Sequence, residues 1–181
     1  MDEITLDAQN KMNKSIDVLT QSLTTLRTGR ASAAMLNGIS VDYYGSPTPL
    51  NQIASITVPE PRQLLIKPYD KNDIKSIVAA INASDIGINP INEGQVVRLN
   101  VPAMTEDRRR EVSKQARKYG EEAKVTIRNI RRDYMDLVKL DEEMTEDYQK
   151  RVEEEIQKVT DEAVKKIDGI IAEKEKEIMS I

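Results

Sequence analysis

The sequence predicts an α+β protein built from an elongated three-helix bundle and a small inserted domain. Apolar residues recur at helical spacing over three long stretches, whereas the segment from Arg30 to Ala103 holds all seven prolines and short β-type runs. None of the three helices could bury its apolar stripe alone, so they are expected to pack together. The chain has 181 residues, 39% of them hydrophobic, which suits one medium domain or two small ones.

The longest stretch, Thr105 to Leu140, is expected to form one continuous helix with two different faces. At about 1.5 Å per residue it would span on the order of 54 Å, which predicts an elongated molecule. One face is an apolar stripe that must be buried, made of Val112, Ala116, Tyr119, Ala123, Ile127, Ile130, Tyr134, Leu137 and Val138. Nearly opposite lies a basic face with Glu121 as its one acid, made of Arg110, Lys114, Arg117, Lys118, Lys124, Arg128, Arg131, Arg132 and Lys139.

A first helix is expected from Asp2 to Thr28, because its apolar residues follow a four-three spacing that forms one seam. Gly29 stands where a helix C-cap favours a residue that can take a left-handed conformation, so the helix is predicted to end there. The seam consists of Met12, Ile16, Leu19, Leu23 and Leu26.

A third helix is expected to begin at Thr145, because Met144-Thr145-Glu146-Asp147 repeats the start signal Met104-Thr105-Glu106-Asp107 of the second. In each, the Thr can cap free amides and the two acids complement the positive helix end. Capping explains the repeat better than a duplication or a metal site, since the flanking sequences do not match. The apolar stripe of this helix is Tyr148, Val152, Ile156, Val159, Ala163, Ile167, Ile170 and Ile178.

The middle of the chain predicts a small α+β insert. Asp73 to Ala83 is its one clear helix, and turns rich in Gly and Pro separate the β-type runs. These runs are Ile39–Tyr44, Ser55–Val58, Leu64–Lys67, Ile86–Ile88 and Val96–Val101.

The expected domains are therefore 1–29 plus 104–181 for the bundle and 30–103 for the insert, joined by two strands of linker. Few contacts need cross such a junction, so relative motion of the domains is the default expectation. The expected hinge residues are Gly29, Arg30, Ala31, Val101, Pro102 and Ala103.

Composition excludes several classes of function. The chain has no Cys, His or Trp, which rules out thiol chemistry, thiolate or imidazole metal sites and histidine-based triads. It also lacks a Gly-rich phosphate loop and a nucleophile elbow, so no enzyme activity, metal or cofactor is expected. The N-terminus has no signal pattern and no apolar run approaches the about 18 residues of a membrane span, so a cytoplasmic protein without membrane contact is expected.

The net charge of −4 hides a strong segregation of charge. Residues 105–140 contain 11 basic and 7 acidic side chains, whereas residues 141–181 contain 7 basic and 14 acidic ones. Overall acidity therefore does not argue against a polyanionic partner reached by one face. Aromatic residues are only 3%, which disfavours base stacking on single strands and favours structured RNA or duplex backbone.

The strongest candidate binding site is the cluster Arg128-Asn129-Ile130-Arg131-Arg132. Ile130 is expected to face the core, so the three arginines would project together, and the planar fork of arginine suits phosphate and guanine edges. The alternative is a solvated face with intrahelical pairs to Glu121, Asp133 or Asp136, and composition alone favours this alternative.

Two weaker candidates lie elsewhere. In Thr28–Ser32 a glycine turn is flanked by Arg27 and Arg30, which could contact a phosphate or merely cap a helix. The acidic runs Asp141–Glu143 and Glu153–Glu155 lack the spacing of a calcium loop, so a solvated face is the better explanation than a metal site.

Five ordered motifs, which together span essentially the whole chain, resemble the ribosome recycling factor family. The resemblance implies an L-shaped protein of tRNA-like dimensions, in which an antiparallel three-helix bundle carries an inserted β/α/β domain. One departure is Ala33, where many members have proline, and this change could loosen the entry to the insert. The motifs are Thr28-Gly29-Arg30-Ala31-Ser32, Val41-Asp42-Tyr43-Tyr44-Gly45-Ser46-Pro47-Thr48-Pro49-Leu50, Ser84-Asp85-Ile86-Gly87-Ile88-Asn89-Pro90, Thr105-Glu106-Asp107-Arg108-Arg109 and Arg128-Asn129-Ile130-Arg131-Arg132-Asp133.

The resemblance implies a monomeric, non-enzymatic translation factor. It would bind the ribosome after termination, its bundle lying on large-subunit rRNA, and with elongation factor G and GTP it would help to split the subunits and release mRNA and tRNA. By motif match, Arg131 corresponds to the arginine most associated with ribosome binding. The expected rRNA-binding residues are Arg131, Arg128, Arg132, Arg117, Arg110, Lys124, Arg27 and Arg30.

A second class of function is a helical-bundle adaptor that binds a protein partner, with a basic stripe that only aids solubility. Strong salt dependence of binding to large subunits would separate the two, since an apolar protein interface is far less sensitive to salt. A hydrolase would need residues that the chain lacks.

Overall fold

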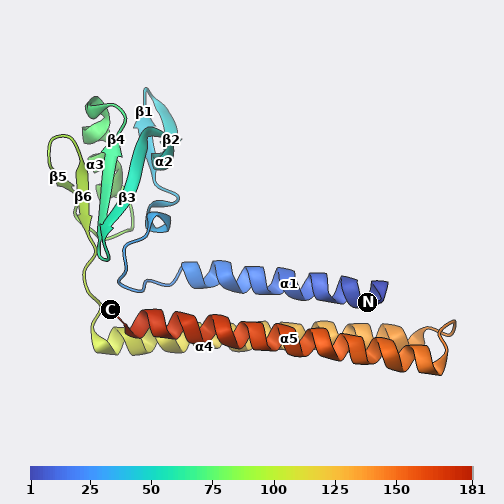
Figure 1. Ribbon diagram of the computed structural model, residues 1–181. Coiled ribbons are helices and arrows are strands. Elements are labelled where there is room, and N and C mark those ends of the chain that lie inside the picture. The colour runs from blue at the N-terminus through green and yellow to red at the C-terminus, as the bar shows by residue number, and fades with distance from the viewer. Residues whose placement is uncertain (181) are drawn as a thin grey trace. The chain divides into compact units, whose positions relative to one another are not determined.

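The computed structural model describes residues 1–180, which divide into two compact units (Figure 1). One unit contains Met1–Arg27 and Glu106–Ser180, and the other contains Thr28–Thr105. The predicted α+β class, with a helical bundle and a small sheet domain, is confirmed. Within residues 1–180 no helix is both long enough and apolar enough to cross a membrane.

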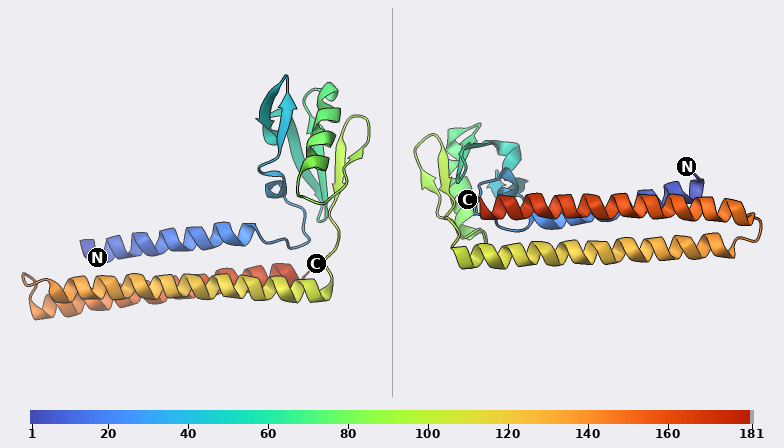
Figure 2. Two further views of the ribbon diagram at one scale, coloured as in Figure 1. Left: turned by 180° about the vertical axis from the view of Figure 1, so that it is seen from behind. Right: turned by 60° about the horizontal axis from the view of Figure 1, so that its bottom comes forward.

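The first unit is a bundle of three long helices. These are α1 (Glu3–Thr24), α4 (Glu106–Leu140) and α5 (Glu146–Met179). All three lie side by side along their lengths, and α4 and α5 run in opposite directions on either side of a short turn (Figures 1 and 2). The buried residues of each helix recur at the predicted three- and four-residue spacing, so the bundle buries one stripe from each helix.

The predicted start signals of the second and third helices coincide with the observed starts of α4 and α5. Thr145 Oγ1 accepts a hydrogen bond from the backbone N–H of Tyr148 at 3.3 Å, as a helix N-cap does. Glu106 and Asp107 occupy the first turn of α4, where their charge complements the helix dipole.

The predicted end of the first helix at Gly29 is wrong, because α1 ends at Thr24. The hydroxyls of Thr24 and Thr25 donate hydrogen bonds of 2.6 Å to the backbone carbonyls of Gln21 and Ser22. Such side-chain bonds compete with the backbone hydrogen bonds of the helix. Two neighbouring threonines form them at this end of α1. Gly29 does adopt a left-handed conformation, with φ 77°, but it does so in the second unit.

The apolar stripe of α4 is buried over most of its length but not throughout. Leu137 was expected in the core and is 55% exposed, while Tyr119 and Ile130 are only half-buried. All three lie on the same margin of the stripe. In a straight helix, residues seven positions apart differ by about 20° in direction, so a line of such residues gradually turns away from the partner helix. On this margin of the stripe the side chains therefore turn toward solvent. On the other margin Met135 packs against the core.

Gly120 permits a close approach of α4 to α5. A Cβ atom at this buried position would lie 2.7 Å from Cγ1 and 3.0 Å from Cδ1 of Ile171 on α5. Glycine inside a helix costs about 1 kcal/mol relative to alanine, and the space that it leaves for Ile171 explains why it stands here.

We predict that Gly120→Ala lowers the free energy of unfolding of the bundle by about 1–3 kcal/mol, because the half-buried Ile171 must move away from the buried position 120. The control is Gly169→Ala on α5, where a Cβ meets nothing within 4 Å. This variant should gain about 0.5–1 kcal/mol from helix propensity alone. Urea unfolding followed by helical circular dichroism measures both, and a Gly120→Ala variant as stable as wild type would contradict the close approach.

Carboxylates hold the start of α1 against α5. Asp2 caps α1 by accepting from the N–H of Ile4 at 2.9 Å, and it also accepts a hydrogen bond from the Tyr148 hydroxyl. Glu155 accepts from the backbone N–H of Asp2 at 2.8 Å and from Thr5 Oγ1 at 3.1 Å. The bond from Tyr148 holds the pKa of Asp2 below its ordinary value, and the bond from the Asp2 N–H does the same for the pKa of Glu155.

Because both pKa values are lowered in the folded state, this attachment is complete above the ordinary carboxylate range and is lost as the pH falls through the lowered values. We therefore predict that the bundle loses stability below about pH 4.5. Asp2→Asn, which keeps a good cap, and Glu155→Gln should each flatten this loss, whereas Glu154→Gln on the exposed side of α5 should not. Urea midpoints measured from pH 3 to pH 7 test this. An unchanged pH profile in both variants would contradict it.

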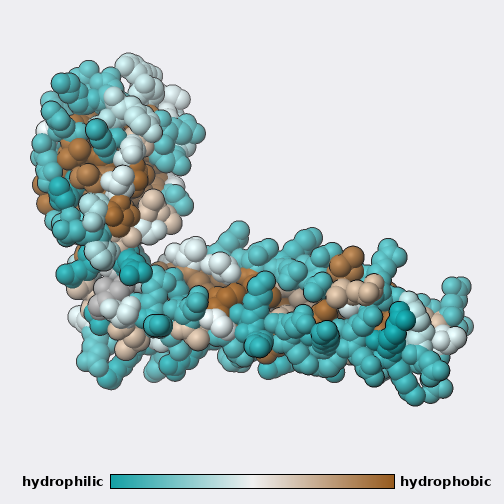
Figure 3. Space-filling view, viewed as in Figure 1, coloured by the Kyte–Doolittle hydropathy of each residue, from teal (hydrophilic) through white to brown (hydrophobic). Residues whose placement is uncertain are grey.

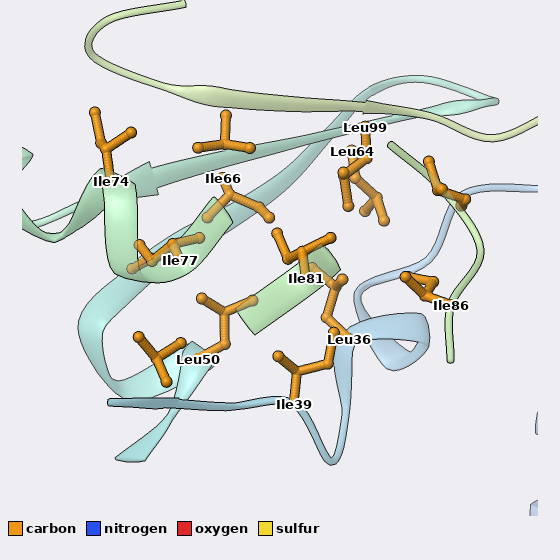
Figure 4. Close-up of a cluster of buried hydrophobic side chains, with 14 of the residues drawn as sticks. Leu36, Ile39, Leu50, Leu64, Ile66, Ile74, Ile77, Ile81, Ile86 and Leu99 are labelled. Atoms are coloured by element: carbon orange, nitrogen blue, oxygen red, sulfur yellow. The ribbon is translucent and has the colours of Figure 1, made fainter. Parts of the chain in front are cut away.

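The second unit contains a four-stranded antiparallel sheet in the order β3-β4-β6-β5 and a separate β1-β2 hairpin. In Figure 4, Ile77 and Ile81 of α3 lie among Leu64 and Ile66 of β4 and Leu99 of β6, and all five are buried. The strands are β1 (Ser40–Tyr43), β2 (Ser46–Pro49), β3 (Ala54–Glu60), β4 (Gln63–Pro68), β5 (Ile91–Asn92) and β6 (Val97–Asn100). The helices are α2 (Leu50–Ile53) and α3 (Ile74–Ala83), with short 3-10 turns at Ala33–Leu36 and Lys71–Asp73.

The predicted strand at Ile86–Ile88 is wrong. Gly87 has φ 70° and interrupts the extended backbone, so Ile86 and Ile88 enter the core from an irregular segment. Alternation of apolar residues, which typifies a strand, here marks a loop that buries every second side chain.

The strand β2 is not among the predicted strands, because Gly45-Ser46-Pro47 indicates a turn. Pro47 and Pro49 pair with Asp42 and Ser40 at the edge of a two-stranded ribbon, where a proline without an N–H is tolerated. Only the two residues Tyr44 and Gly45, with φ 50° and 79°, connect β1 to β2, as in a tight hairpin turn.

Two of the six expected hinge residues are anchored in the insert. The backbone N–H of Ala31 donates to the Pro61 carbonyl at 2.7 Å, and that of Val101 donates to the Arg62 carbonyl at 2.8 Å. Both side chains are buried in the core of this unit. Ala31 and Val101 therefore belong to the packed insert rather than to a linker.

Candidate nucleic-acid interface

Five of the nine residues of the basic face of α4 form two rows. One row, Arg117, Lys124 and Arg131, recurs every seven residues and lies along the contact with α5; we call it the seam row. The other consists of Arg128 and Arg132, one helical turn apart and exposed; we call it the outer row. Figure 3 shows the side of the bundle on which α5 lies in front of α4, and this side is largely hydrophilic with some apolar patches.

Two members of the seam row form ion pairs with α5. Arg117 pairs with Glu175. Lys124 pairs with Asp168, and at 3.4 Å with Glu121 on its own helix. The side chain of Lys124 is only 17% exposed, and its bond to Asp168 raises its pKa above the ordinary value. Both cations are expected on a face open to RNA; Lys124 is instead mostly covered, whereas Arg117 is paired but its side chain remains 65% exposed.

Arg131 is also turned toward α5 rather than away from the core as the sequence suggested. It is half-buried, and its Nε–H donates to Oε1 of Gln157 at 2.7 Å. Its two Nη nitrogens make no hydrogen bond within residues 1–180, so they stay available to a ligand. Gln157 is neutral, so the charge of Arg131 remains uncompensated by this contact.

The outer row is the most accessible part of the cluster. Arg128 is exposed and has no ion pair among the residues that the structure describes. Arg132 approaches Asp133 at 4.0 Å, with 68% and 69% of the two side chains exposed, a contact that solvent screens strongly. The predicted intrahelical pairing of this face is therefore weak at the cluster itself.

The remaining expected residues lie elsewhere. Arg110 pairs with Glu106 at 2.6 Å one turn earlier in α4. Arg27 is exposed at the end of the first chain segment of the bundle, and Arg30 is exposed in the other unit. The structure thus brings Arg128, Arg131 and Arg132 together, whereas Arg110 lies about five turns away along α4.

Sequence reasoning missed the α5 side of this surface, namely Gln157, Asp168 and Glu175. Their roles depend on how α5 is aligned against α4, which no local pattern gives. A signal was nevertheless present, because Asp161, Asp168 and Glu175 recur every seven residues like the seam row opposite them.

Comparison with known proteins identifies the family to which this chain belongs. The model of the family described as Ribosome recycling factor matches residues 19–179. The chain belongs to the ribosome recycling factor family. The ribosome-recycling factor of Streptococcus pyogenes serotype M28 (strain MGAS6180) is 55% identical over 177 residues, 96% of each chain. That of Staphylococcus epidermidis (strain ATCC 35984) is 50% identical over 184 residues, with both chains fully covered.

Solved structures agree with this assignment. A solution structure of the ribosome recycling factor aligns with a TM-score of 0.79 and 38% identity, covering 99% of this chain and 97% of that one. A second match, with a TM-score of 0.64, 46% identity and coverage of 98% and 97%, is a recycling factor in models for the T. thermophilus factor and the E. coli elongation factor G bound to the E. coli post-termination complex. The family fold is therefore confirmed over nearly the whole chain.

We predict that the seam row and the outer row differ in their effect on stability. Lys124→Ala removes two ion pairs at a mostly covered side chain and should lower the free energy of unfolding by about 0.5–1 kcal/mol. Arg128→Ala should change it by less than about 0.5 kcal/mol. Urea unfolding in low and high salt tests the difference. Equal effects of the two substitutions would show that the Lys124 pairs contribute nothing measurable.

Proposed function

We propose that this protein binds the ribosome after termination and, together with elongation factor G and GTP, promotes separation of the subunits and release of mRNA and tRNA. Family membership over nearly the whole chain supports this function. The observation that carries its mechanism is the arginine cluster of α4, which presents two exposed guanidinium groups and one that is held but not neutralised.

In this proposal the bundle anchors on rRNA of the large subunit. Guanidinium groups suit the sugar-phosphate backbone, because their planar forks donate two parallel hydrogen bonds to one phosphate. Arg128 and Arg132 provide accessible forks, and Arg131 provides its two Nη groups. Arg117 and Lys124 contribute mainly by holding α4 against α5 in the orientation that presents this cluster.

Subunit separation then requires motion of the insert relative to the anchored bundle. We assign the hinge to Thr28–Arg30 and Pro102–Thr105, outside the anchored residues Ala31 and Val101. The work comes from the partner GTPase, so the protein itself needs no catalytic chemistry, and it acts in the cytoplasm, as a monomer, where ribosomes are recycled.

We predict that Arg131→Ala weakens binding to purified large subunits by about 5- to 150-fold, the range expected for loss of a bidentate contact to phosphate or guanine. If the contact is to phosphate, the slope of log affinity against log salt should also fall by about one. Arg128→Ala and Arg132→Ala should weaken binding in the same direction. Lysine at position 131 should restore binding only in part, because a point charge does not reproduce the fork.

The matched control is Arg151→Ala, which removes an exposed arginine from the acidic helix α5 and leaves the cluster intact. It should bind like wild type. The proposed RNA surface is wrong if Arg131→Ala keeps wild-type affinity at moderate salt, or if it melts so low that loss of the fold explains the loss of binding.

A further inference from the structure

The ion pairs of the seam row define an alignment of α4 against α5. Arg117 meets Glu175, and Lys124, seven residues on, meets Asp168, seven residues back along the antiparallel helix. One more step of seven residues on each helix sets Asp161 opposite Arg131. The simplest continuation of the row is therefore a third ion pair, between Arg131 and Asp161.

That third pair does not form, because Gln157 lies between the two charges. Arg131 Nε–H donates to Gln157 Oε1 at 2.7 Å, and Gln157 Nε2 donates to Asp161 Oδ1 at 2.8 Å. The orientation of the amide is fixed by chemistry, because a guanidinium can only donate and an ionised carboxylate can only accept. Gln157 thus satisfies both groups while keeping them apart.

We infer that Gln157 is a positioning residue, which holds Arg131 by its Nε atom and keeps Asp161 from neutralising it. This inference rests on the proposed rRNA-binding role of Arg131. A direct pair with Asp161 would offset the charge of Arg131, as the carboxylates of Glu175 and Asp168 offset the charges of Arg117 and Lys124. With the amide as partner, both Nη groups and the full positive charge stay free for phosphate.

The test is Gln157→Leu in the full-length protein, with affinity for purified large subunits as the measurement. Without the amide, Arg131 is expected to turn to Asp161, so binding should weaken by about 5-fold or more even though Arg131 is still present. Adding Asp161→Asn to this variant should restore most of the affinity, because the competing charge is removed. The urea midpoints of these variants should stay close to wild type.

The control for net charge is Asp168→Asn in the same Gln157→Leu background. It removes one carboxylate of the same row, next to Lys124 rather than Arg131. Equal rescue by Asp168→Asn and Asp161→Asn would overturn the inference, since net charge alone would then explain the result. Unchanged binding of Gln157→Leu would overturn it as well.

Arg131→Ala, measured beside these variants, separates failure of the inference from failure of the proposed function. If Arg131→Ala binds like wild type, both the proposed RNA surface at this residue and the role of Gln157 are wrong. If Arg131→Ala loses binding and Gln157→Leu does not, only the role of Gln157 is wrong. When Arg131 is already absent, Gln157→Leu should cause no further loss, which a general structural defect would cause.

Discussion

The close packing of α4 against α5 at Gly120 fixes the alignment on which the rest of the bundle depends. With no side chain on Gly120, Ile171 occupies the space beside the α4 backbone. In this alignment Arg117 and Lys124 each meet a carboxylate on α5. If α5 were shifted along α4 by one helical turn, Ile171 would no longer face Gly120 and the two ion pairs would be separated. Packing in the core and charge at its margin therefore specify the same arrangement, which is the consistency expected of a uniquely folded sequence.

Most of the fold could be predicted because helical periodicity is a local property of the chain. The three helices and their start signals follow from spacing and capping chemistry, and α4 and α5 begin where the Thr-Glu-Asp signal indicated. The errors occurred where tertiary structure decides. Pro47 and Pro49 join a strand because it lies at the edge of a two-stranded ribbon, and Ile86 is buried without belonging to a strand.

The candidate site was predictable in its composition but not in its contacts. An arginine cluster on one turn can be read directly from the sequence, whereas the partners of Arg131 and Lys124 come from another helix. The expectation that Arg131 points into solvent assumed a constant rotation per residue along a straight stripe. The drift of α4 relative to that stripe turns Leu137 outward, and Arg131 contacts α5, so a small angular error changed its environment.

Segregation of charge between α4 and the segment after it restricts how a polyanion can approach the bundle. Residues 141–181 carry 14 acidic and 7 basic side chains, so the surface formed by α5 repels phosphate, while α4 attracts it. These electric fields decay over about 10 Å at 0.1 M salt, which is much shorter than the length of either helix. Each surface therefore acts only on the part of an RNA that lies nearest to it. Asp168 has two electrostatic effects. It forms an ion pair with Lys124 of α4, and its negative charge repels phosphate on the α5 side. Arg128 and Arg132 of the outer row are exposed and form no ion pair with a carboxylate of α5 among residues 1–180, so in the proposed function they are accessible to an RNA backbone. In the proposed function, the charges that align the helices would therefore also favour one orientation of the bundle on RNA.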